Sequence, residues 1–453
     1  MSPRRLFPAI PLLAISLWTA ADPLRADGPG LEAEIARHPL DGLVRTAVGV
    51  TRQDTSIPAF LDPADLKAAV KTPRVLLVGG LDGSADSVRA VMSGLSEART
   101  SAAILNAFAV SRVPRALPDQ SGTSEPAPLS FPPTGNAYNE PATDAAHYLW
   151  RWIGMQAPDL VIVVSGENAT ADSLVAALGK SAPCEMGTIP AIRVAPDAKD
   201  GLTRAFAPLQ NLAPSPARIE WQRRVARTPI EVATELGTVY GHKLDPVMYI
   251  PALAIIGRMR LGELTGDARP LEDAKALGEP YRSGAKDSMG DKGNGSTLSG
   301  HLVFAELAHR TGDPGWIALA RKAADYGFDE TGQPKESMPF HSEMSDSVFM
   351  GCAPLAEAAA LTGDAKYADQ CLRHLRLMQR HCLREDGIYR HSPLDESAWG
   401  RGNGFPALGM ALSLSALPED SEAHAAFLKS YRDHLAALRQ HQDPTGAWHQ
   451  VID

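Results

Sequence analysis

The sequence has 453 residues, of which 44% are hydrophobic and 21% are charged. This composition is typical of a folded globular protein, and the length exceeds that of one ordinary domain, so two domains are expected. The formal net charge of -9 provides no basic surface, which argues against nucleic acid as the main partner. The four cysteines are too few and too scattered for a disulfide scaffold, and Cys352, Cys371 and Cys382 are expected to be small buried residues of helices.

The first 26 residues have the pattern of an export signal. Arg4 and Arg5 precede an apolar run over residues 6–17, and small residues that suit cleavage follow it. The run is shorter than the roughly 18 to 20 residues that a spanning helix needs. We therefore expect residues 1–26 to be a cleaved signal peptide and the protein to be exported, periplasmic or extracellular, with no membrane association beyond export.

Residues 27–225 are predicted to form an α/β domain. Apolar runs at 74–80 and 159–164 alternate with helical patterns at 87–95 and 145–155. This alternation predicts a parallel or mixed sheet covered by helices. The segment 114–141 is rich in Pro, Ser and Gly and is expected to be a long surface loop.

Residues 226–453 are predicted to be all-helical. Apolar residues recur at helical spacing near 247–264, 269–280, 297–311, 314–327, 347–362, 364–383, 404–416 and 421–441. Thr-Gly-Asp occurs at 265–267, 311–313 and 362–364, where the glycine can end one helix in the left-handed conformation and the aspartate can cap the next. Such corners about 50 residues apart indicate a repeated helix pair, which closes into a toroid or stacks into a solenoid. Long loops that carry motifs favour the toroid.

Four stretches of the helical part are distinctive in combination. They are Met-Pro-Phe-His at 338–341 leading to Met-Ser-Asp-Ser-Val-Phe-Met at 344–350, Asp-Gly-Ile-Tyr-Arg-His at 386–391, Trp-Gly-Arg-Gly-Asn-Gly-Phe at 399–405, and Gln-Asp at 442–443 leading to Gly-Ala-Trp-His-Gln-Val-Ile-Asp at 446–453. Together they resemble the unsaturated glucuronyl and rhamnogalacturonyl hydrolases, glycoside hydrolase families 88 and 105. The resemblance implies an (α/α)6 toroid whose mouth binds a 4,5-unsaturated uronic acid at the non-reducing end of an oligosaccharide.

The resemblance also implies a hydration reaction that needs no metal or organic cofactor. A protonated carboxyl delivers a proton to C4 of the vinyl ether, water adds at C5, and the resulting hemiketal opens and releases the sugar. Asp346 matches the acid/base of this pattern. The alternative interpretation is that Asp346, which follows Ser345 at the start of a helix, is a cap.

The remaining site candidates are expected to line the sugar pocket. A guanidinium at Arg401 suits a carboxylate, and the indole of Trp399 offers a flat face to a sugar ring. Asn403 shares their glycine-spaced turn, and His391 resembles the family's pocket histidine. Further pocket lining is expected from His341 and Trp448. Each of these residues also has a structural interpretation, as part of a tight turn, a polar loop or the packed interior.

Two departures from the family pattern are visible. The family usually carries a second aspartate before the helix that begins here near Leu298, and Asn294 or Asp291 is expected to occupy that space. Asn294 is neutral and cannot replace a carboxylate by charge. In addition, about eight helices are predicted where a closed toroid requires twelve. We therefore expect the toroid to be incomplete, so that either the native chain continues past residue 453 or the barrel is open.

The first domain carries a weaker resemblance to the zinc carboxypeptidases, in the segments 76–83, 131–140 and 150–164. The zinc ligands of that family are missing from this sequence. Asp82 and Asp86 stand near the first His and Glu, residues 165–167 replace the second His, and His147 is expected to be structural. A carboxypeptidase-like domain without zinc is predicted, serving for packing or glycan binding.

Three functions follow from the sequence. The first is an exported hydrolase of unsaturated uronyl oligosaccharides, with an oligosaccharide as its partner molecule. The second is a carbohydrate-binding protein without turnover, which the missing aspartate would permit. The third is another (α/α)6 enzyme, a polysaccharide lyase or an ordinary glycosidase, which would show a Tyr or His base or a second carboxylate across the cleft.

Overall fold

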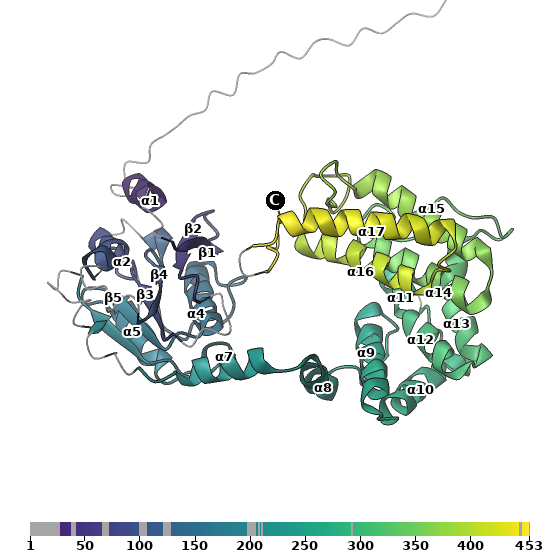
Figure 1. Cartoon of the computed structure of the whole chain (residues 1–453), viewed down its shortest axis with the longest axis horizontal. Coiled ribbons are helices and arrows are strands. Elements are labelled where there is room, and N and C mark those ends of the chain that lie inside the picture. The colour runs from purple at the N-terminus through teal and green to yellow at the C-terminus, as the bar shows by residue number, and fades with distance from the viewer. Residues whose placement is uncertain are drawn as a thin grey trace, which may run out of the picture. The chain divides into compact units, whose positions relative to one another are not determined.

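A computed structural model describes residues 28–37, 42–65, 72–98, 107–120, 128–196, 205–206, 209, 212–290, 293–443 and 446–452. The chain divides into two compact units, Met1–Ala226 and Arg227–Asp453 (Figure 1). The expected signal peptide over residues 1–26 and the candidate Asp291 lie outside the described residues. Among the helices that are described, none is long and apolar enough to span a membrane.

The first unit, called unit 1, is built on a mixed sheet of six strands in the order β1-β2-β4-β3-β5-β6. The strands are β1 Val44–Val50, β2 Ser56–Leu61, β3 Arg74–Val78, β4 Ala109–Val113, β5 Leu160–Val164 and β6 Ala191–Val194. Strands β4, β3, β5 and β6 are parallel, whereas β1 pairs antiparallel with β2 and β2 with β4. Every residue of β3, β4 and β5 is buried, as expected for strands covered on both faces. The mixed sheet predicted from the sequence is confirmed.

The helices of unit 1 connect and cover these strands (Figure 1). They are α1 Gly28–Arg37, α2 Ala85–Ala98, α4 Asp144–Gln156, α5 Ala169–Leu178 and α7 Pro216–Ala226, with short 3-10 turns at Pro118–Gln120, Pro141–Thr143 and Pro183–Glu185. The helices predicted at 87–95 and 145–155 correspond to α2 and α4. A buried ionic cluster at Asp65, Arg74 and Arg218 joins α7 to the sheet, and burial raises the pKa of Asp65 to about 6.

The second unit, called unit 2, is helical. Its helices are α8 Pro229–Val239, α9 Tyr249–Thr265, α10 Arg269–Arg282, α11 Gly295–Gly300, α12 Leu302–Thr311, α13 Pro314–Ala324, α14 Ala353–Thr362, α15 Ala365–Cys382, α16 Gly400–Ala416 and α17 Glu422–Gln440, with a 3-10 turn at Asp325–Gly327 and a π-helix, η6, at Val348–Cys352. All eight predicted segments are helical. Three of them are divided: the segment 297–311 breaks at His301 into α11 and α12, the segment 314–327 is α13 followed by a 3-10 turn, and the segment 347–362 begins as η6 and continues as α14.

All three glycines of the Thr-Gly-Asp corners and two of the three aspartates behave as predicted, whereas Ala268 and not Asp267 is the N-cap of α10. Gly266, Gly312 and Gly363 end α9, α12 and α14 in the left-handed conformation. Asp313 and Asp364 are the N-caps of α13 and α15, where each carboxylate accepts a hydrogen bond from a backbone N–H. Each corner therefore reverses the chain between two packed helices.

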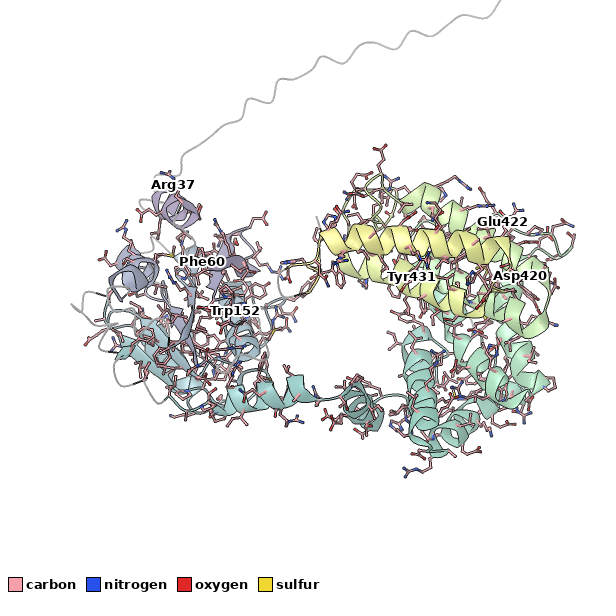
Figure 2. The ribbon with its side chains drawn as sticks, in the orientation of Figure 1. Arg37, Phe60, Trp152, Asp420, Glu422 and Tyr431 are labelled. Atoms are coloured by element: carbon pink, nitrogen blue, oxygen red, sulfur yellow. The ribbon has the colours of Figure 1, made fainter. Side chains whose placement is uncertain are left out.

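The core of unit 2 lies between these helices. Tyr431 on α17 packs against it, and Glu422 at the start of α17 accepts a hydrogen bond from Arg376 on α15 at 2.7 Å (Figure 2). The cysteines at 352, 371 and 382 are buried and unbridged, as the sequence predicts.

Two buried histidines tie loops to the helices of unit 2. His374 on α15 accepts a hydrogen bond from the N–H of Met338 at Nδ1, so Nε2 carries the proton and lies 3.0 Å from the carbonyl oxygen of Ser347. His301 has the opposite arrangement, because its Nδ1 donates to the carbonyl oxygen of Thr297 at 2.8 Å and its Nε2 lies 2.9 Å from the hydroxyl of Ser288. Burial lowers the pKa of each imidazole to about 4. The neutral imidazole of His374 therefore contacts both ends of the segment 338–347.

Helix α16 packs closely on η6 at Gly409. A Cβ atom at this position would lie 2.6 Å from the backbone N and Cα of Phe349, which is too short for a non-bonded contact. Gly404, on the same helix, has no atom within 4 Å of an added Cβ. Of these two glycines, only Gly409 must lack a side chain for α16 and η6 to pack this closely.

We expect Gly409→Ala to destabilise unit 2 by about 1–3 kcal/mol, because η6 must move to admit the methyl group. Gly404→Ala is the matched control and should be neutral or stabilising by roughly 0.5–1 kcal/mol, since alanine favours helix. Urea unfolding followed by circular dichroism measures both. Equal effects of the two substitutions would contradict the packing argument.

We expect the free energy of unfolding of unit 2 to fall as the pH is lowered from about 6.5 to about 4. In that range the unfolded chain binds a proton at His374 that the folded chain does not, which costs the fold up to roughly 3 kcal/mol at pH 4. His374→Gln should flatten this dependence by about one proton, as measured by urea unfolding at several pH values. Ser347→Ala keeps the imidazole and should leave the dependence in place; a His374→Gln profile equal to the wild-type profile would refute the assignment.

Candidate functional site

Asp346 and His391 form a close pair in unit 2. Asp346 lies just before η6, is 6% exposed, and accepts at its backbone carbonyl the hydrogen bonds of Phe349 and Met350 that begin the helix. Its Oδ2 atom lies 3.2 Å from Nδ1 of His391. The pair is within ion-pair distance but is not aligned for a hydrogen bond, and Oδ2 is buried with no hydrogen-bond partner among the described residues. A buried carboxylate oxygen in this condition is ready to bond to a ligand or to carry a proton.

Ser345 fixes the two neighbouring segments against Asp346. Its N–H donates to the carbonyl oxygen of His391 at 2.9 Å, and its hydroxyl donates to the carbonyl oxygen of Gly402 at 2.9 Å. Gly402 lies beside both groups, since a Cβ there would be at ordinary contact distance, 3.4 Å from Ser345 Oγ and 3.7 Å from His391 Nδ1. The segments 344–346, 389–391 and 399–403 therefore meet at one place.

The buried Asn403 connects the segments 389–391 and 399–403 through its side-chain amide. Its amide nitrogen donates to the carbonyl oxygens of Tyr389 and Trp399, and its amide oxygen accepts the N–H of Tyr389 at 2.7 Å. The buried His434 lies 3.2 Å from the carbonyl oxygen of Asn403. Because both ends of the amide are bonded to backbone, Asn403 is equipped to position the loop, and its side chain offers no group to a sugar.

Trp399 and Arg401 present the polar and aromatic groups of the turn. The indole of Trp399 is 38% exposed and its ring lies 6.3 Å from that of His391. Arg401 is exposed and makes no hydrogen bond or ion pair with any residue that the structure describes. The guanidinium is therefore available to an anionic ligand.

The last described segment runs beside this turn. The N–H of Gly400 donates to the carbonyl oxygen of Gln450 at 2.9 Å, and the N–H of Ile452 donates to Ala398 at 2.8 Å. Trp448 is 46% exposed, and its indole N–H donates to the carbonyl oxygen of Leu438. The motif at 446–453 therefore lies next to the motif at 399–405, and a hydrogen bond holds the indole of Trp448.

His341 lies beside Gly295 at the start of α11. A Cβ atom at Gly295 would lie 2.6 Å from Nδ1 of His341 and 2.8 Å from Sδ of Met350. Asn294 precedes that glycine and caps α11, with its side-chain oxygen accepting the N–H of Thr297 at 3.0 Å. The capping bond accounts for the asparagine side chain, so it supplies neither a carboxylate nor a second acid.

The structure thus brings Asp346, His391 and Trp399 together, with Arg401 two residues after Trp399 and His341 beside Gly295. Residues that the sequence did not single out hold them in place: Ser345, Tyr389, His374 and His434. A serine beside the candidate acid was visible in the sequence, but its two partners lie 46 and 57 positions away in the chain. Nothing local in the sequence marks the two buried histidines.

In unit 1, Asp82 lies in the region where the carboxypeptidase resemblance implies zinc ligands, and its carboxylate is fully hydrogen-bonded within the protein. Asp82, after β3, accepts from the N–H of Ser84 and the hydroxyl of Ser87 at Oδ1, and from the hydroxyl of Ser165 and the N–H of Gly166 at Oδ2. Burial would raise the pKa of Asp82, but these bonds outweigh it and hold the pKa below its ordinary value. Across the described part of the chain, no three His, Cys, Asp or Glu residues gather as a metal site.

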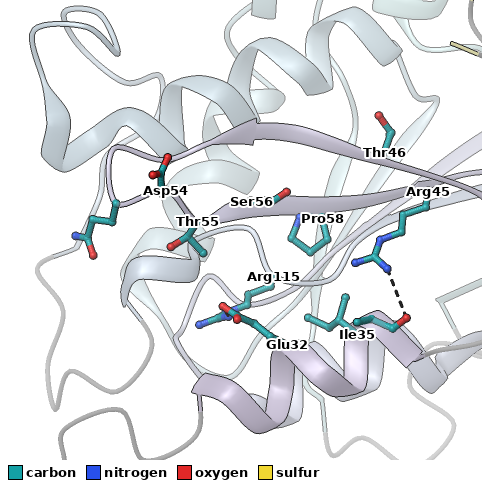
Figure 3. A pocket seen from close by; sticks show the side chains of 11 residues that line it. Glu32, Ile35, Arg45, Thr46, Asp54, Thr55, Ser56, Pro58 and Arg115 are labelled. Atoms are coloured by element: carbon teal, nitrogen blue, oxygen red, sulfur yellow. Dashed lines mark hydrogen bonds and ion pairs between the residues drawn. The ribbon is translucent and has the colours of Figure 1, made fainter. Parts of the chain in front are cut away.

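A hollow of about 400 Å³ lies between α1 and the β1–β2 hairpin of unit 1 (Figure 3). Two guanidiniums face it. Arg115 pairs with Glu32 on α1 at 3.0 Å, and Arg45 donates to the carbonyl oxygen of Ala36 at the end of α1. Both arginines therefore fasten α1 to the sheet, which explains their presence without a ligand.

Comparison with known proteins agrees with the motifs. The sequence model of Glycosyl Hydrolase Family 88 matches residues 223–453. The unsaturated rhamnogalacturonyl hydrolase YesR of Bacillus subtilis (strain 168) is 28% identical over 187 residues, which cover 35% of this chain and 52% of YesR. The chain thus spans about half the length of this curated relative.

Two solved structures are similar to part of the chain. A glycoside hydrolase of family 105 from C. acetobutylicum ATCC 824 has 17% identity and a TM-score of 0.43, over 50% of this chain and 70% of that chain. A glycosyl hydrolase of family 88 from Bacteroides vulgatus has 16% identity and a TM-score of 0.40, over 50% of this chain and 72% of that chain. The family match extends over half of the present sequence and includes all four motifs. The chain therefore belongs to glycosyl hydrolase family 88.

Proposed function

We propose that this protein hydrolyses unsaturated uronyl oligosaccharides by hydrating the 4,5 double bond, with Asp346 as acid and base. One observation carries the proposal: in a chain of family 88, a buried carboxylate oxygen without a hydrogen-bond partner lies 3.2 Å from His391. A carboxylate that serves a fold alone is normally bonded to a donor, as Asp82 and Asp313 are.

The reaction requires three tasks of these residues. Asp346 in its protonated form gives its proton to C4, and the ionised carboxylate then accepts a proton from the water that adds at C5. The hemiketal formed at C5 opens without further help and releases the neighbouring sugar. His391 lies within ion-pair distance of the carboxylate, with its Nδ1 atom 3.2 Å from Oδ2 of Asp346. The chain's own side chains perform each of these tasks.

Substrate binding is assigned to the exposed groups around the pair. Arg401 is placed to bind the uronate carboxylate, because its guanidinium is exposed and has no partner among the described residues. Trp399 offers its ring to the sugar, and His341 and Trp448 line the neighbouring surface. Asn403 and Asn294 are assigned to positioning, because backbone groups use their amides.

The first substrate to test is an unsaturated rhamnogalacturonyl disaccharide, after the name of the similar YesR. An unsaturated glucuronyl disaccharide is the second.

We further propose that unit 2 is part of an (α/α)6 toroid, that unit 1 is a carboxypeptidase-like fold without zinc, and that the protein is exported by the signal at residues 1–26. The four hydrogen bonds of Asp82 support a unit 1 without zinc, because they use both oxygens of the carboxylate in the region where a metal would bind.

A carbohydrate-binding protein without turnover is the second candidate. The observation that favours it is the cap role of Asn294: the residue at the position of the family's second aspartate supplies no carboxylate. Binding of the unsaturated disaccharide without loss of its vinyl-ether absorbance would identify this function. A rise in absorbance on a polymeric uronan would instead identify a lyase.

We expect Asp346→Asn to lower turnover of the unsaturated disaccharide by roughly 10²-fold or more, because general acid catalysis contributes about 10²–10⁴-fold. Loss of the vinyl-ether absorbance measures the rate. Binding, measured by calorimetry, should persist because the amide keeps the shape of the carboxyl group.

The matched control is Asp313→Asn, a change of the same chemistry at a simple helix cap. Asparagine caps a helix about as well as aspartate, so this variant should keep both turnover and stability. If Asp346→Asn behaved like Asp313→Asn, Asp346 would be a cap and the mechanism would be wrong.

A further inference from the structure

Two buried cysteines of unit 2 contact each other across neighbouring helices. Cys352 is the last residue of η6, and Cys371 lies within α15, which packs against η6. The Sγ atom of Cys371 lies 3.3 Å from the carbonyl oxygen of Cys352, and the Sγ atom of Cys352 lies 3.9 Å from the carbonyl oxygen of Cys371. Each thiol therefore reaches across the helix interface to the backbone of the other cysteine.

The two helices approach closely at this place. A Cβ atom at Gly351 would lie 2.4 Å from Nε2 of His374, which is too short for a non-bonded contact. Gly351 directly precedes Cys352 in η6, and His374 follows Cys371 by about one turn on the same face of α15. Disulfides join Cα atoms that are roughly 4.4–6.8 Å apart, so between two helices they require a close approach of this kind.

The third buried cysteine of unit 2, Cys382, has different neighbours. Its Sγ atom lies 3.7 Å from the carbonyl oxygen of Glu343 and 3.9 Å from the carbonyl oxygen of His391. Cys382 thus contacts the loop segments of the candidate site, whereas Cys352 and Cys371 contact each other's backbone. These contacts select Cys352 and Cys371 as the pair that can be bridged.

We propose that Cys352 and Cys371 are joined by a disulfide bond when the protein folds in an oxidising compartment. The oxidant is a small disulfide such as oxidised glutathione, and the reaction is two successive exchanges. One cysteine thiolate attacks the small disulfide, forms a mixed disulfide and releases one thiol. The second cysteine thiolate attacks the mixed disulfide, closes the bridge and releases another thiol. The protein gives up two electrons and two protons, which the two released thiols carry away.

The bridge would fasten the helix that follows the candidate acid. The N–H of Met350 in η6 donates to the carbonyl oxygen of Asp346 at 3.1 Å, and Cys352 ends the same helix. A bond from Cys352 to Cys371 therefore attaches the far end of η6 to α15. Disulfides persist in exported proteins and are rare in the cytosol, so this inference rests on the proposed export and is independent of the proposed hydrolysis.

Burial decides when the bridge can form. Both cysteines are 0% exposed. Burial raises the pKa of the Cys352 thiol well above its ordinary value, and the adjoining Cys371 thiol raises it further. Because the thiolate and not the thiol attacks a disulfide, the folded protein reacts slowly and the bridge closes while the chain folds.

Refolding of the full chain from urea with oxidised and reduced glutathione tests the bridge. After alkylation without reduction, mass spectrometry of the digested chain should show one peptide pair linked through Cys352 and Cys371. Titration in urea should then find two free thiols among the four cysteines of the wild-type chain. Cys382→Ala is the matched control on the same helix and should keep the linked pair, whereas Cys371→Ala should abolish it.

Stability gives a second measurement on the same samples. The oxidised wild-type chain should unfold at a higher urea concentration than the same chain unfolded with a reductant, because the bridge restricts the unfolded state. Cys382→Ala should show this difference and Cys371→Ala should not. If a variant does not fold, the thiol count and the linked peptides of the wild-type chain decide the question by themselves.

The outcomes separate the bridge from the proposed function. Four free thiols after refolding, or a bridge that includes Cys184 or Cys382, would overturn the inference even if the chain hydrolyses the unsaturated disaccharide. Conversely, a chain that never consumes the vinyl ether but forms the linked pair would support the bridge and reject the hydrolase. Because the protein is refolded in a defined glutathione mixture, the thiol count does not depend on whether the chain is exported.

Discussion

The candidate site depends on the bonds of a single buried serine. The N–H of Ser345 holds the carbonyl of His391, and its hydroxyl holds the carbonyl of Gly402. Asp346 follows Ser345 in the chain, and Arg401 precedes Gly402. These bonds therefore fix the backbone near His391 and Arg401 relative to Asp346. A bonded serine of this kind satisfies two backbone carbonyls that would otherwise be buried without donors, so the same contacts that stabilise the fold also set the geometry of the site.

Close packing around η6 makes that geometry possible. The π-helix precedes α14 and packs through two glycines: Gly409 of α16 faces the backbone of Phe349, and Gly351 of η6 itself faces Nε2 of His374. Such π segments are frequent at functional sites because they re-aim a side chain without breaking the helix. Here the re-aimed residues are those that follow Asp346. The constraint explains why glycines of α16 and η6 matter although they touch no substrate.

The sequence predicted the helices of unit 2 well because their apolar residues follow the helical period and the Thr-Gly-Asp corners mark their ends. It missed α8, none of whose residues is buried, although Thr228 and Glu231 form a capping box that signals its start. In the site, the motifs placed Asp346, His391 and Trp399 together. They could not reveal the roles of Ser345, Asn403 and His374, because each role is defined by a partner distant in the chain. Asn294 was assigned to the pocket by its position in the motif, and its cap bond became visible only in three dimensions.

Buried polar atoms that lack a hydrogen bond occur in both units, and the units differ at their two candidate carboxylates. In unit 1, Asp82 is bonded at both oxygens, and the arginines that face the hollow are engaged by α1, so little is left for a ligand to bind there. In the described part of unit 2, Oδ2 of Asp346, Nδ1 of His341 and Oγ of Ser296 are buried without partners. Each such group costs the fold about 1–3 kcal/mol. A ligand could offset that cost at Asp346, whereas the four hydrogen bonds of Asp82 already use both of its oxygens, and this difference between the two carboxylates is the reason to seek chemistry in unit 2.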